Sequence, residues 1–344
     1  MFDSLPELDA VDNSPRANAV DVESVTAPGT LDPRAGTIHP RARPSAGNAS
    51  HAQTASPTVA AMSELDDRSR NDGATERSQR ANVARAQRLR ELHVPGDPLV
   101  LVNVWDVVGA RAVQAAGALA VATASYAMSA ARGLPDGEGL DLADVLAVVG
   151  GIAAAVEVPV TVDLERGFGA TPDDVAASVT RVLEAGAVGC NIEDSLVPLG
   201  VAADDGLRGV DEQCARLAAA RDAGAAAGIP LVLNARTDAL ARGESVAETV
   251  ARGRVYLDAG ADCVLVAGRV TLPDVATLVE AFDGRLNVLG RPGQPSIVEL
   301  SRAGVCRISI GSSGVAIAEA ALHRAAVQLL ARGDYLTDQA FALP

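Results

Sequence analysis

The sequence contains no lysine, because all 29 of its basic residues are arginine. This absence excludes a Schiff-base aldolase, a pyridoxal-phosphate enzyme and a Walker A nucleotide site, each of which depends on a lysine side chain. Histidine is almost as scarce, and none of the four is placed where catalysis is expected: His39, His51, His93 and His323. The chemistry must therefore come from carboxylates, arginines, hydroxyls, amides or a bound metal.

Aromatic residues are also scarce, and the net charge is negative. Only 2% of the 344 residues are aromatic, so the core has to be built from alanine, valine, leucine and isoleucine. A net charge of −15 disfavours binding to nucleic acids and to anionic membranes. We see no uninterrupted apolar run for a membrane span and no apolar signal segment, so we expect a cytoplasmic protein. The four cysteines form no CxxC pair, which fits buried thiols in a reducing compartment.

The chain divides into three parts by composition. Residues 1–78 are rich in Ser, Pro, Ala, Asn, Asp and Arg and poor in large apolar residues. Such a segment cannot bury enough surface to offset its chain entropy, and we predict that it is disordered. Residues 79–335 are predicted to form one catalytic domain, beginning with a helix over 79–93, and residues 336–344 a C-terminal tail.

From residue 98 onward, apolar runs alternate with Ala-rich amphipathic stretches. Eight runs have the character of buried strands: 98–104, 119–125, 158–164, 187–193, 230–236, 262–268, 285–290 and 305–311. Helical windows follow them, near 106–116, 140–156, 172–185, 210–228, 244–259, 272–282, 296–303 and 314–332. Eight such units predict an α/β fold, a (β/α)8 TIM barrel. A doubly wound open sheet is the alternative, but no GxGxxG follows the first strand.

The third predicted strand ends in acids. It reads VPVTVDLERGFG, and Asp163 and Glu165, two residues apart, point to the same side of the strand. Glu193 ends the next strand, and in a barrel these strand ends meet at the catalytic rim. Three carboxylates there repel one another unless a cation lies among them, and all-oxygen ligands suit Mg²⁺ or Mn²⁺. The alternative is a structural salt-bridge cluster with neighbouring arginines.

Other strand ends supply candidates for substrate contacts. Arg236, at the end of the fifth strand, is suited to hold a carboxylate through two parallel hydrogen bonds. Ser125 and Tyr126 end the second strand, where they are either substrate contacts or residues at the edge of the core. Asp136 follows in GLPDGEG, which is either a functional loop or a plain acidic turn.

These residues, in this order, resemble the isocitrate lyase / phosphoenolpyruvate mutase superfamily. The matching segments cover about residues 98–335 and include NVWD, ATAS followed by LPDGE, VPVTVDLERGFG, EAGAVGCNIEDS, LVLNARTDA, YLDAGADCVLV and LSRAGVCRISIG. The resemblance implies a Mg²⁺-dependent barrel enzyme that acts on 2-oxo acids or their enol forms. It also implies a homotetramer in which the last helix, over residues 314–332, packs on a neighbouring subunit.

The resemblance also implies roles for individual residues. Asp163, Glu165 and Glu193 match the acids that hold the metal and its waters, and Asp136 matches a further metal-side or gating acid. From the strand ends and the resemblance together, we predict three groups of site residues: metal ligands Asp163, Glu165 and Glu193; catalytic residues Arg236, Asp136 and Tyr126; and substrate-binding residues Ser125, Tyr126, Asn103, Asn234 and Arg236.

Departures from the family pattern narrow the reaction. Lyases for isocitrate and methylisocitrate carry a Lys-Lys-Cys-Gly-His-type loop, whereas the stretch after the fourth strand here is EDSLVPLGVAADDGLRG. Phosphonomutases carry a lysine in this loop, where the present chain has Ser195. Glu165 also stands where many members have aspartate, which lengthens one metal ligand by a methylene.

We therefore hypothesise a Mg²⁺-dependent lyase that cleaves a C–C bond in a small 2-oxo, 2-hydroxy or substituted malate-type acid through a metal-stabilised enolate. The base stays open between Tyr126, Ser195 and a metal-bound hydroxide. The alternatives are an oxaloacetate-type C–C hydrolase, a phosphonomutase, and an inactive barrel that only binds a ligand. The expected partners are a small carboxylic acid and further copies of the chain, and not nucleic acids or membranes.

Overall fold

The computed structural model describes residues 76, 78–199 and 206–333 of the chain. Apart from residues 76 and 78, the segment predicted to be disordered, 1–78, lies outside the described residues, and so does the predicted tail, 336–344. From residue 78 onward, helices and parallel strands alternate along the chain.

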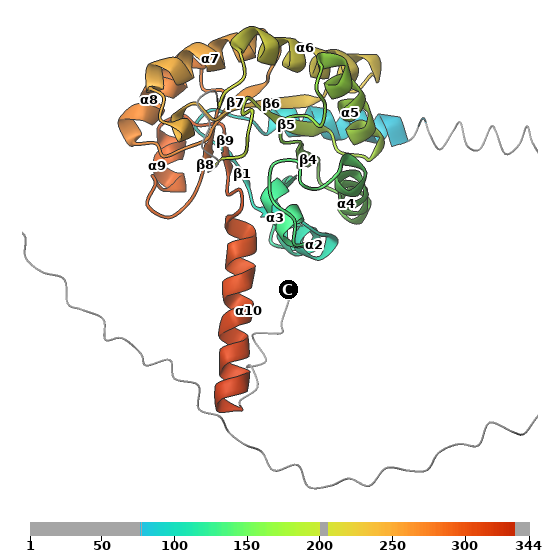
Figure 1. Cartoon of the computed structure of the whole chain (residues 1–344), viewed down its shortest axis with the longest axis vertical. Coiled ribbons are helices and arrows are strands. Elements are labelled where there is room, and N and C mark those ends of the chain that lie inside the picture. The colour runs from blue at the N-terminus through green and yellow to red at the C-terminus, as the bar shows by residue number, and fades with distance from the viewer. Residues whose placement is uncertain (1–75, 77, 200–205, 334–344) are drawn as a thin grey trace, which may run out of the picture. The chain divides into compact units, whose positions relative to one another are not determined.

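Nine parallel strands form a nearly closed barrel, and the helices lie around it (Figure 1). The strands are β1 (Leu99–Leu101), β2 (Asn103–Val104), β3 (Val121–Thr123), β4 (Val160–Asp163), β5 (Gly189–Glu193), β6 (Val232–Thr237), β7 (Cys263–Val266), β8 (Leu286–Leu289) and β9 (Arg307–Ser309). The order across the sheet is β1-β9-β8-β7-β6-β5-β4-β3-β2. The predicted TIM barrel is confirmed.

The first predicted strand, 98–104, is divided into β1 and β2. β1 pairs with β9, with Leu99 opposite Arg307, whereas β2 pairs with β3, with Asn103 opposite Ala122. Val102 lies between the two halves and is 37% exposed. One short run of chain therefore closes the barrel by pairing with a different neighbour on each half, and the eight predicted strands become nine.

The helices match the predicted windows closely. They are residues 78–91, α2 (Val107–Ala115), α4 (Leu142–Ala155), α5 (Pro172–Glu184), α6 (Val210–Ala226), α7 (Val246–Asp258), α8 (Leu272–Ala281), α9 (Ile297–Arg302) and α10 (Ser313–Arg332). Capping boxes at Thr171, Thr271 and Ser296 fix the starts of α5, α8 and α9, because each side chain bonds to a backbone N–H one turn later. Two short helices were not predicted: α3 (Ser125–Ala130) and the 3-10 helix η1 (Leu240–Arg242).

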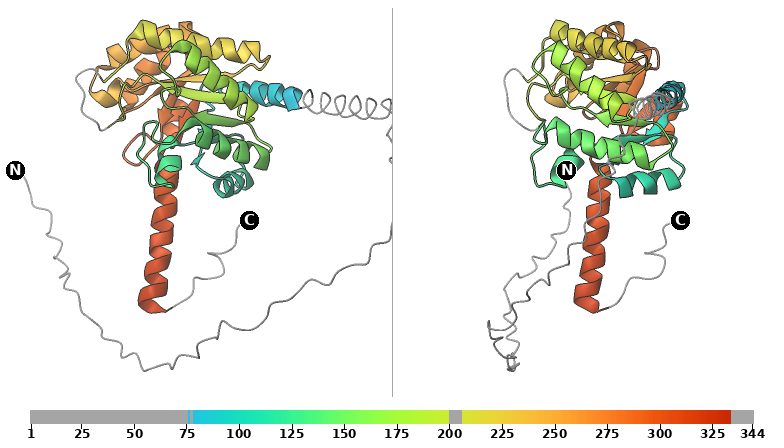
Figure 2. Two further views of the ribbon diagram at one scale, coloured as in Figure 1. Left: turned by 45° about the vertical axis from the view of Figure 1, so that its right-hand side comes forward. Right: turned by 90° about the vertical axis from the view of Figure 1, so that its right-hand side faces the viewer.

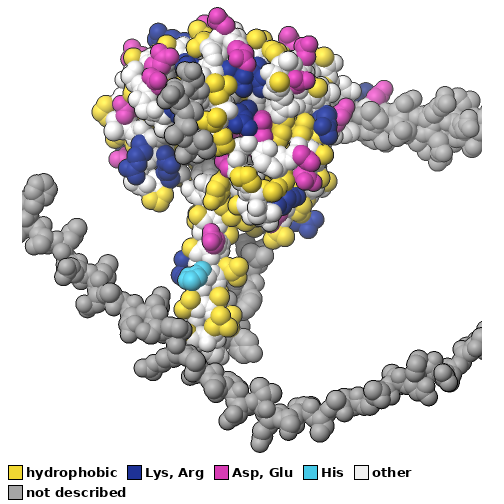
Figure 3. Space-filling view, viewed as in Figure 1, with side chains coloured by type: hydrophobic (Ala, Val, Ile, Leu, Met, Phe, Trp, Pro, Cys, Tyr) yellow, Lys and Arg dark blue, Asp and Glu magenta, His cyan; other side chains and the backbone are white. Residues whose placement is uncertain are grey.

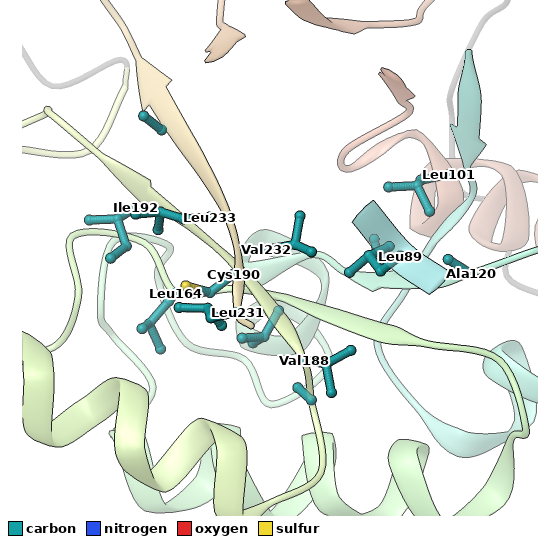
Figure 4. Close-up of a cluster of buried hydrophobic side chains, with 14 of the residues drawn as sticks. Leu89, Leu101, Ala120, Leu164, Val188, Cys190, Ile192, Leu231, Val232 and Leu233 are labelled. Carbon is teal, nitrogen blue, oxygen red and sulfur yellow. The ribbon is translucent and has the colours of Figure 1, made fainter. Parts of the chain in front are cut away.

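The helix over residues 78–91 closes the amino-terminal end of the barrel. Leu89 is fully buried, and Figure 4 shows it among side chains of the barrel strands, including Val188 and Val232. Gly189 makes room for it, because a Cβ at that position would lie 2.8 Å from Leu89 Cδ2 and 2.9 Å from Thr161 Oγ1. The carboxyl ends of the strands lie at the opposite end of the barrel, which is the end that carries active sites in this fold.

The last helix, α10, has few contacts with the barrel. No residue in its Ser313–Ala331 window is buried, and the views in Figures 1 and 2 show it standing away from the ring of helices. Hydrophobic side chains gather along it in Figure 3, and Leu322 and Leu330 are 73% and 88% exposed. Among the described residues it is the one helix that is long and apolar enough to cross a membrane, which corrects our expectation that none would be. An apolar surface of this kind equally suits packing on another protein.

Candidate active site

Polar side chains gather where β3, β4, β5 and β6 end. Asp163 is the last residue of β4 and is partly open to solvent. Ser125, at the start of α3, donates its Oγ–H to Asp163 Oδ2 at 3.0 Å, and its backbone N lies 3.4 Å from the same oxygen. Asp163 in turn donates its backbone N–H to Thr123 Oγ1 at 3.0 Å. These bonds fix the Asp163 carboxylate between the ends of two neighbouring strands.

Glu165 is buried beside Asp163 in a strained backbone conformation. Its φ of 48° lies in the left-handed region that side-chain-bearing residues rarely adopt. Its Oε2 accepts a hydrogen bond from the backbone N–H of Glu138, which lies in the loop after α3. Burial, followed by the charge of Asp163, raises the pKa of Glu165 to about 8. Glu165 therefore connects the acid cluster to the 133–140 loop.

Glu193 and Arg236 form an ion pair across neighbouring strands. They lie opposite each other in the register of β5 and β6, and Arg236 Nη1 lies 2.6 Å from Glu193 Oε2. Burial raises the pKa of Glu193, Arg236 lowers it, and Asp238 and Asp163 raise it again, so that the net shift is upward. Burial opposes the charge on Arg236, but the carboxylates around it outweigh that effect and raise its pKa well above the usual value.

Asp136 lies at the outer edge of the same cluster. Asp136 is exposed as a whole residue. Its pKa is nevertheless raised, first by loss of water around the carboxylate and then by the charge of the nearby Asp163, while hydrogen bonding from Ser125 opposes this shift. The pKa of Glu165 is also raised by Asp136. The structure therefore brings together the four predicted acids at one rim of the barrel, together with Arg236.

The acids are not arranged as a closed metal cage. Within the described part of the chain, no three His, Cys, Asp or Glu side chains lie close enough together to hold a metal ion. The Glu165 carboxylate is engaged by the amide of Glu138, and that of Glu193 by Arg236. The donor set nevertheless fits a hydrated hard cation, because it consists of oxygens and its members raise one another's pKa.

The remaining predicted residues differ in their access to the rim. Tyr126 is 50% exposed on the first turn of α3. Asn103 is buried, and its amide bonds to the backbone of Thr123 and Gly311 at 2.8 and 2.9 Å. Asn234 lies two residues before Arg236 on β6. It is fully buried and donates to Asn191 Oδ1 at 2.8 Å. Both asparagine side chains are therefore hydrogen-bonded to other residues of the chain, so a role in substrate binding would be indirect.

Two ion pairs at this rim were not predicted from the sequence. Arg166 pairs with Glu138 at 3.1 Å and so links the loops after α3 and β4. Asp238 holds the guanidinium of Arg236, with Nε–Oδ1 and Nη2–Oδ2 distances of 2.7 and 3.0 Å. A signal for the second relationship was present, because residues two apart at a strand end lie on the same side.

The chain is similar to proteins of one known family. The profile of the family described as phosphoenolpyruvate phosphomutase matches residues 89–330. The phosphoenolpyruvate phosphomutase of Streptomyces hygroscopicus is 33% identical over 224 residues, which is 62% of this chain and 70% of the relative. Other relatives are named phosphonopyruvate hydrolase and 2-methylisocitrate lyase, so the relatives are enzymes that cleave or rearrange bonds in small acids.

Solved structures with the same fold belong to similarly named proteins. A protein from Burkholderia cenocepacia J2315, provisionally assigned as a phosphonomutase, is 38% identical with a TM-score of 0.67, and the match covers 74% of this chain and all (100%) of that one. A phosphonopyruvate hydrolase in complex with oxalate and Mg²⁺ is 25% identical with a TM-score of 0.66, over 76% of this chain and 91% of that one. An oxaloacetate acetylhydrolase with the product oxalate has a TM-score of 0.67 at 25% identity, over 75% of this chain and 91% of that one.

Proposed function

The chain belongs to the phosphoenolpyruvate phosphomutase family, and we propose that it is an enzyme that cleaves a carbon–carbon bond in a small 2-oxo, 2-hydroxy or substituted malate-type acid. The observation that carries this proposal is the acid cluster around Asp163, which lies at the carboxyl ends of the strands beside Arg236. A cationic anchor next to a crowded set of carboxylates suits an acidic substrate bound together with a divalent cation.

We propose Mg²⁺, or Mn²⁺ in its place, as the cofactor. Asp163, Glu165 and Glu193 would hold the ion and its waters, with Asp136 as a further acid beside them. Two features support this: the all-oxygen donor set fits a hydrated cation, and the related phosphonopyruvate hydrolase was solved with oxalate and Mg²⁺. When bound, the metal would supply positive charge that stabilises an enolate or oxyanion as it develops.

The chain's own residues would bind and orient the substrate. Arg236 donates its Nε–H and one Nη2–H to Asp238, and its Nη1 forms an ion pair with Glu193, so N–H groups on both terminal nitrogens would stay available for a substrate carboxylate. Ser125 lies against Asp163, where its backbone and hydroxyl would contact the substrate. The exposed Tyr126 next to it would complete that side of the site.

The identity of the base separates two candidate reactions. Ser195 is fully buried, donates to Asp238 and accepts from Arg242, which disfavours it as the base and leaves Tyr126 or water. Residues 195–207 contain no Lys, His or Cys. This observation favours, as a second candidate, an oxaloacetate-type hydrolase in which water attacks directly. It counts against phosphonomutase activity, while the intact acids and Arg236 count against an inactive barrel.

We also propose that the enzyme works as a homo-oligomer, a tetramer by family resemblance, in the cytoplasm. A groove of about 550 Å³ lies between β1 and the end of α2, and ten residues with mostly apolar side chains line it, among them Leu99, Val113 and Leu119. The exposed apolar side chains of α10 suit this groove on a second copy of the chain. All four cysteines are free thiols, which supports a reducing compartment.

Calorimetric titration of oxalate, a planar mimic of the pyruvate enolate, tests the proposal. We expect the wild type to bind oxalate with Mg²⁺ and not with EDTA. Asp163→Asn and Arg236→Lys should lose binding, whereas Asp173→Asn, an exposed acid on α5, should retain it. Absence of wild-type binding under both conditions would overturn the metal-and-carboxylate proposal.

A substrate screen over oxaloacetate, alkyl-substituted malates and phosphonopyruvate would then identify the reaction. Reactions run in ¹⁸O-labelled water separate the two candidates. A hydrolase transfers a solvent oxygen to one of the product carboxylates, whereas a lyase that cleaves the same bond does not.

A further inference from the structure

Two fully buried carboxylates lie behind the rim, Asp194 after β5 and Asp238 after β6. They are neighbours, because the backbone N–H of Asp238 donates to Asp194 Oδ1 at 2.9 Å. A buried carboxylate is costly unless it is paired and hydrogen-bonded, so the partners of each acid show what it stabilises. Those partners differ.

Asp238 is paired with the substrate-anchoring arginine. Both of its oxygens accept from Arg236, from Nε at 2.7 Å and from Nη2 at 3.0 Å, in a parallel two-bond arrangement. Glu193 holds the remaining nitrogen, Nη1, at 2.6 Å. The guanidinium is therefore held by carboxylates on two sides, Asp238 and Glu193, and its other N–H groups would remain for a substrate carboxylate.

The same carboxylate is tied to the segment that follows β5. Ser195 donates its Oγ–H to Asp238, and Arg242 on η1 donates to Ser195 Oγ at 3.3 Å from both Nε and Nη2. Arg242 also donates to the carbonyl oxygen of Val197. A continuous set of hydrogen bonds thus connects Arg236 to the first residues after β5.

Asp194 has a different set of partners. It accepts from Thr237 Oγ1 and from the Tyr256 hydroxyl, both at 2.9 Å, and its Oδ2 lies 3.5 Å from Arg252 Nη1. Its hydrogen bond with Arg236 involves the two backbones alone, at 3.2 Å. Asp194 therefore joins β6 to α7. Among the side chains that the structure describes, it makes no hydrogen bond with the guanidinium of Arg236.

We propose that Asp238 is a positioning residue that fixes the guanidinium of Arg236 in the orientation that receives the substrate carboxylate. The inference rests on the proposed function of the site and deepens it. Asp238 acts through Arg236 and does not touch the substrate. Asparagine cannot replace it, because an amide offers one acceptor oxygen and turns an NH2 group toward a donor of Arg236 or Ser195.

The test compares Asp238→Asn with Asp194→Asn and Tyr256→Phe. Each variant removes part of the same buried network, but only the first removes an acceptor from Arg236. Oxalate affinity in the presence of Mg²⁺ is measured by calorimetry, and thermal unfolding is measured in parallel. We expect Asp238→Asn to weaken oxalate binding by about tenfold or more. Both control variants should bind oxalate within about twofold of the wild type. This should hold even where their unfolding temperature falls as much as that of Asp238→Asn.

Several results would overturn the proposal. One is an oxalate affinity of Asp238→Asn within about twofold of the wild type, and another is equal weakening in Asp194→Asn. If Asp238→Asn does not fold, Ser195→Ala removes one hydrogen bond from Asp238 and should weaken oxalate binding by roughly threefold. An unchanged affinity in that variant would contradict the inference.

Failure of the proposed function can be told apart from failure of this inference. If the wild type does not bind oxalate at all, the proposed function fails, and ligand-free crystal structures decide the role of Asp238. A guanidinium of Arg236 that moves in Asp238→Asn, or in Ser195→Ala where the first variant does not fold, but stays in place in Asp194→Asn would support the positioning role. A guanidinium that stays in place in all of these variants would overturn it.

Discussion

The guanidinium of Arg166 lies 3.1 Å from the carboxylate of Glu138, in an ion pair that links the loops after α3 and β4. Arg166 Nη2 also donates to the carbonyl oxygen of Gly137 at 2.8 Å, and Nη1 donates to that of Leu196 at 3.3 Å. Beneath it, the fully buried Arg216 donates to the backbone carbonyl of Arg166 itself. One side chain therefore joins three segments of the rim.

Replacing Arg166 should loosen the loop that contacts Glu165. Arg166→Gln removes the ion pair with Glu138 and at least one of the hydrogen bonds to the carbonyl oxygens of Gly137 and Leu196. The loop over residues 133–140 should therefore move away from the rim more often. We expect hydrogen exchange at the Glu138 amide, which donates to Glu165, to become faster by roughly tenfold. Arg181→Gln on α5, an exposed arginine, is the matched control and should exchange like the wild type. Equal protection in both variants would show that the loop is held by other contacts.

His93 predicts an acid-sensitive component of stability at the closed end of the barrel. Its Nδ1 lies 2.7 Å from the carbonyl oxygen of Leu89, and its buried Nε2 has no hydrogen-bond partner among the residues described. Burial, followed by the charge of Arg307, lowers the pKa of His93 from 6.5 to about 4. The fold therefore favours the neutral ring. The resulting stabilisation is fully present above pH 6.5 and is lost as the pH falls from 6.5 through about 4.

Urea unfolding over this pH range measures that component. The free energy of unfolding of the wild type should fall more steeply between pH 6.5 and 4 than that of His93→Asn, which keeps a donor near Leu89 but cannot titrate. The difference between the two proteins isolates His93 from the carboxylates that also titrate there. Parallel curves would mean that His93 does not contribute to acid unfolding.

Gly189 should be intolerant of a side chain, because three groups surround the place of its Cβ. Leu89 Cδ2, Thr161 Oγ1 and Val232 O would lie at 2.8, 2.9 and 3.0 Å. We expect Gly189→Ala to lower the free energy of unfolding by about 1–3 kcal/mol, as overpacking of a core does. Gly150→Ala on α4, where the nearest atom would be 3.8 Å away, should be neutral or stabilising because alanine favours helices. Denaturant unfolding of both variants checks this, and equal effects would contradict it.

Most of the fold was predictable because parallel barrel strands are apolar throughout and their helices are amphipathic. The two errors have different causes, one local and one non-local. α3 contains six residues, which is too short for a periodic pattern, and the Ser-Tyr-Ala-Met sequence resembles a strand end. The division of the first strand depends on pairing with β9 and β3, which lie far apart in the sequence.

The candidate site was predictable in position but not in its pairings. Placing Asp163, Glu193 and Arg236 at one rim requires only that parallel strands end at the same side of the barrel. Which acid pairs with which cation depends on strand register and on loop conformation. Glu165, for example, bonds to the Glu138 amide because its own backbone turns into the left-handed region. The composition of the loops does not show such turns.

The apolar surface of α10 gives the last prediction, which concerns assembly. If α10 packs in the groove beside β1 of another copy, charges on either surface should disrupt the oligomer. Leu330→Asp on α10 and Leu119→Asp in the groove each introduce a carboxylate. The leucines that they replace are 88% and 53% exposed in the single chain. Light scattering coupled to size-exclusion chromatography should show smaller species for both. Val298→Asp on α9, also 57% exposed, should keep the wild-type mass, and a monomeric wild type would refute the assembly.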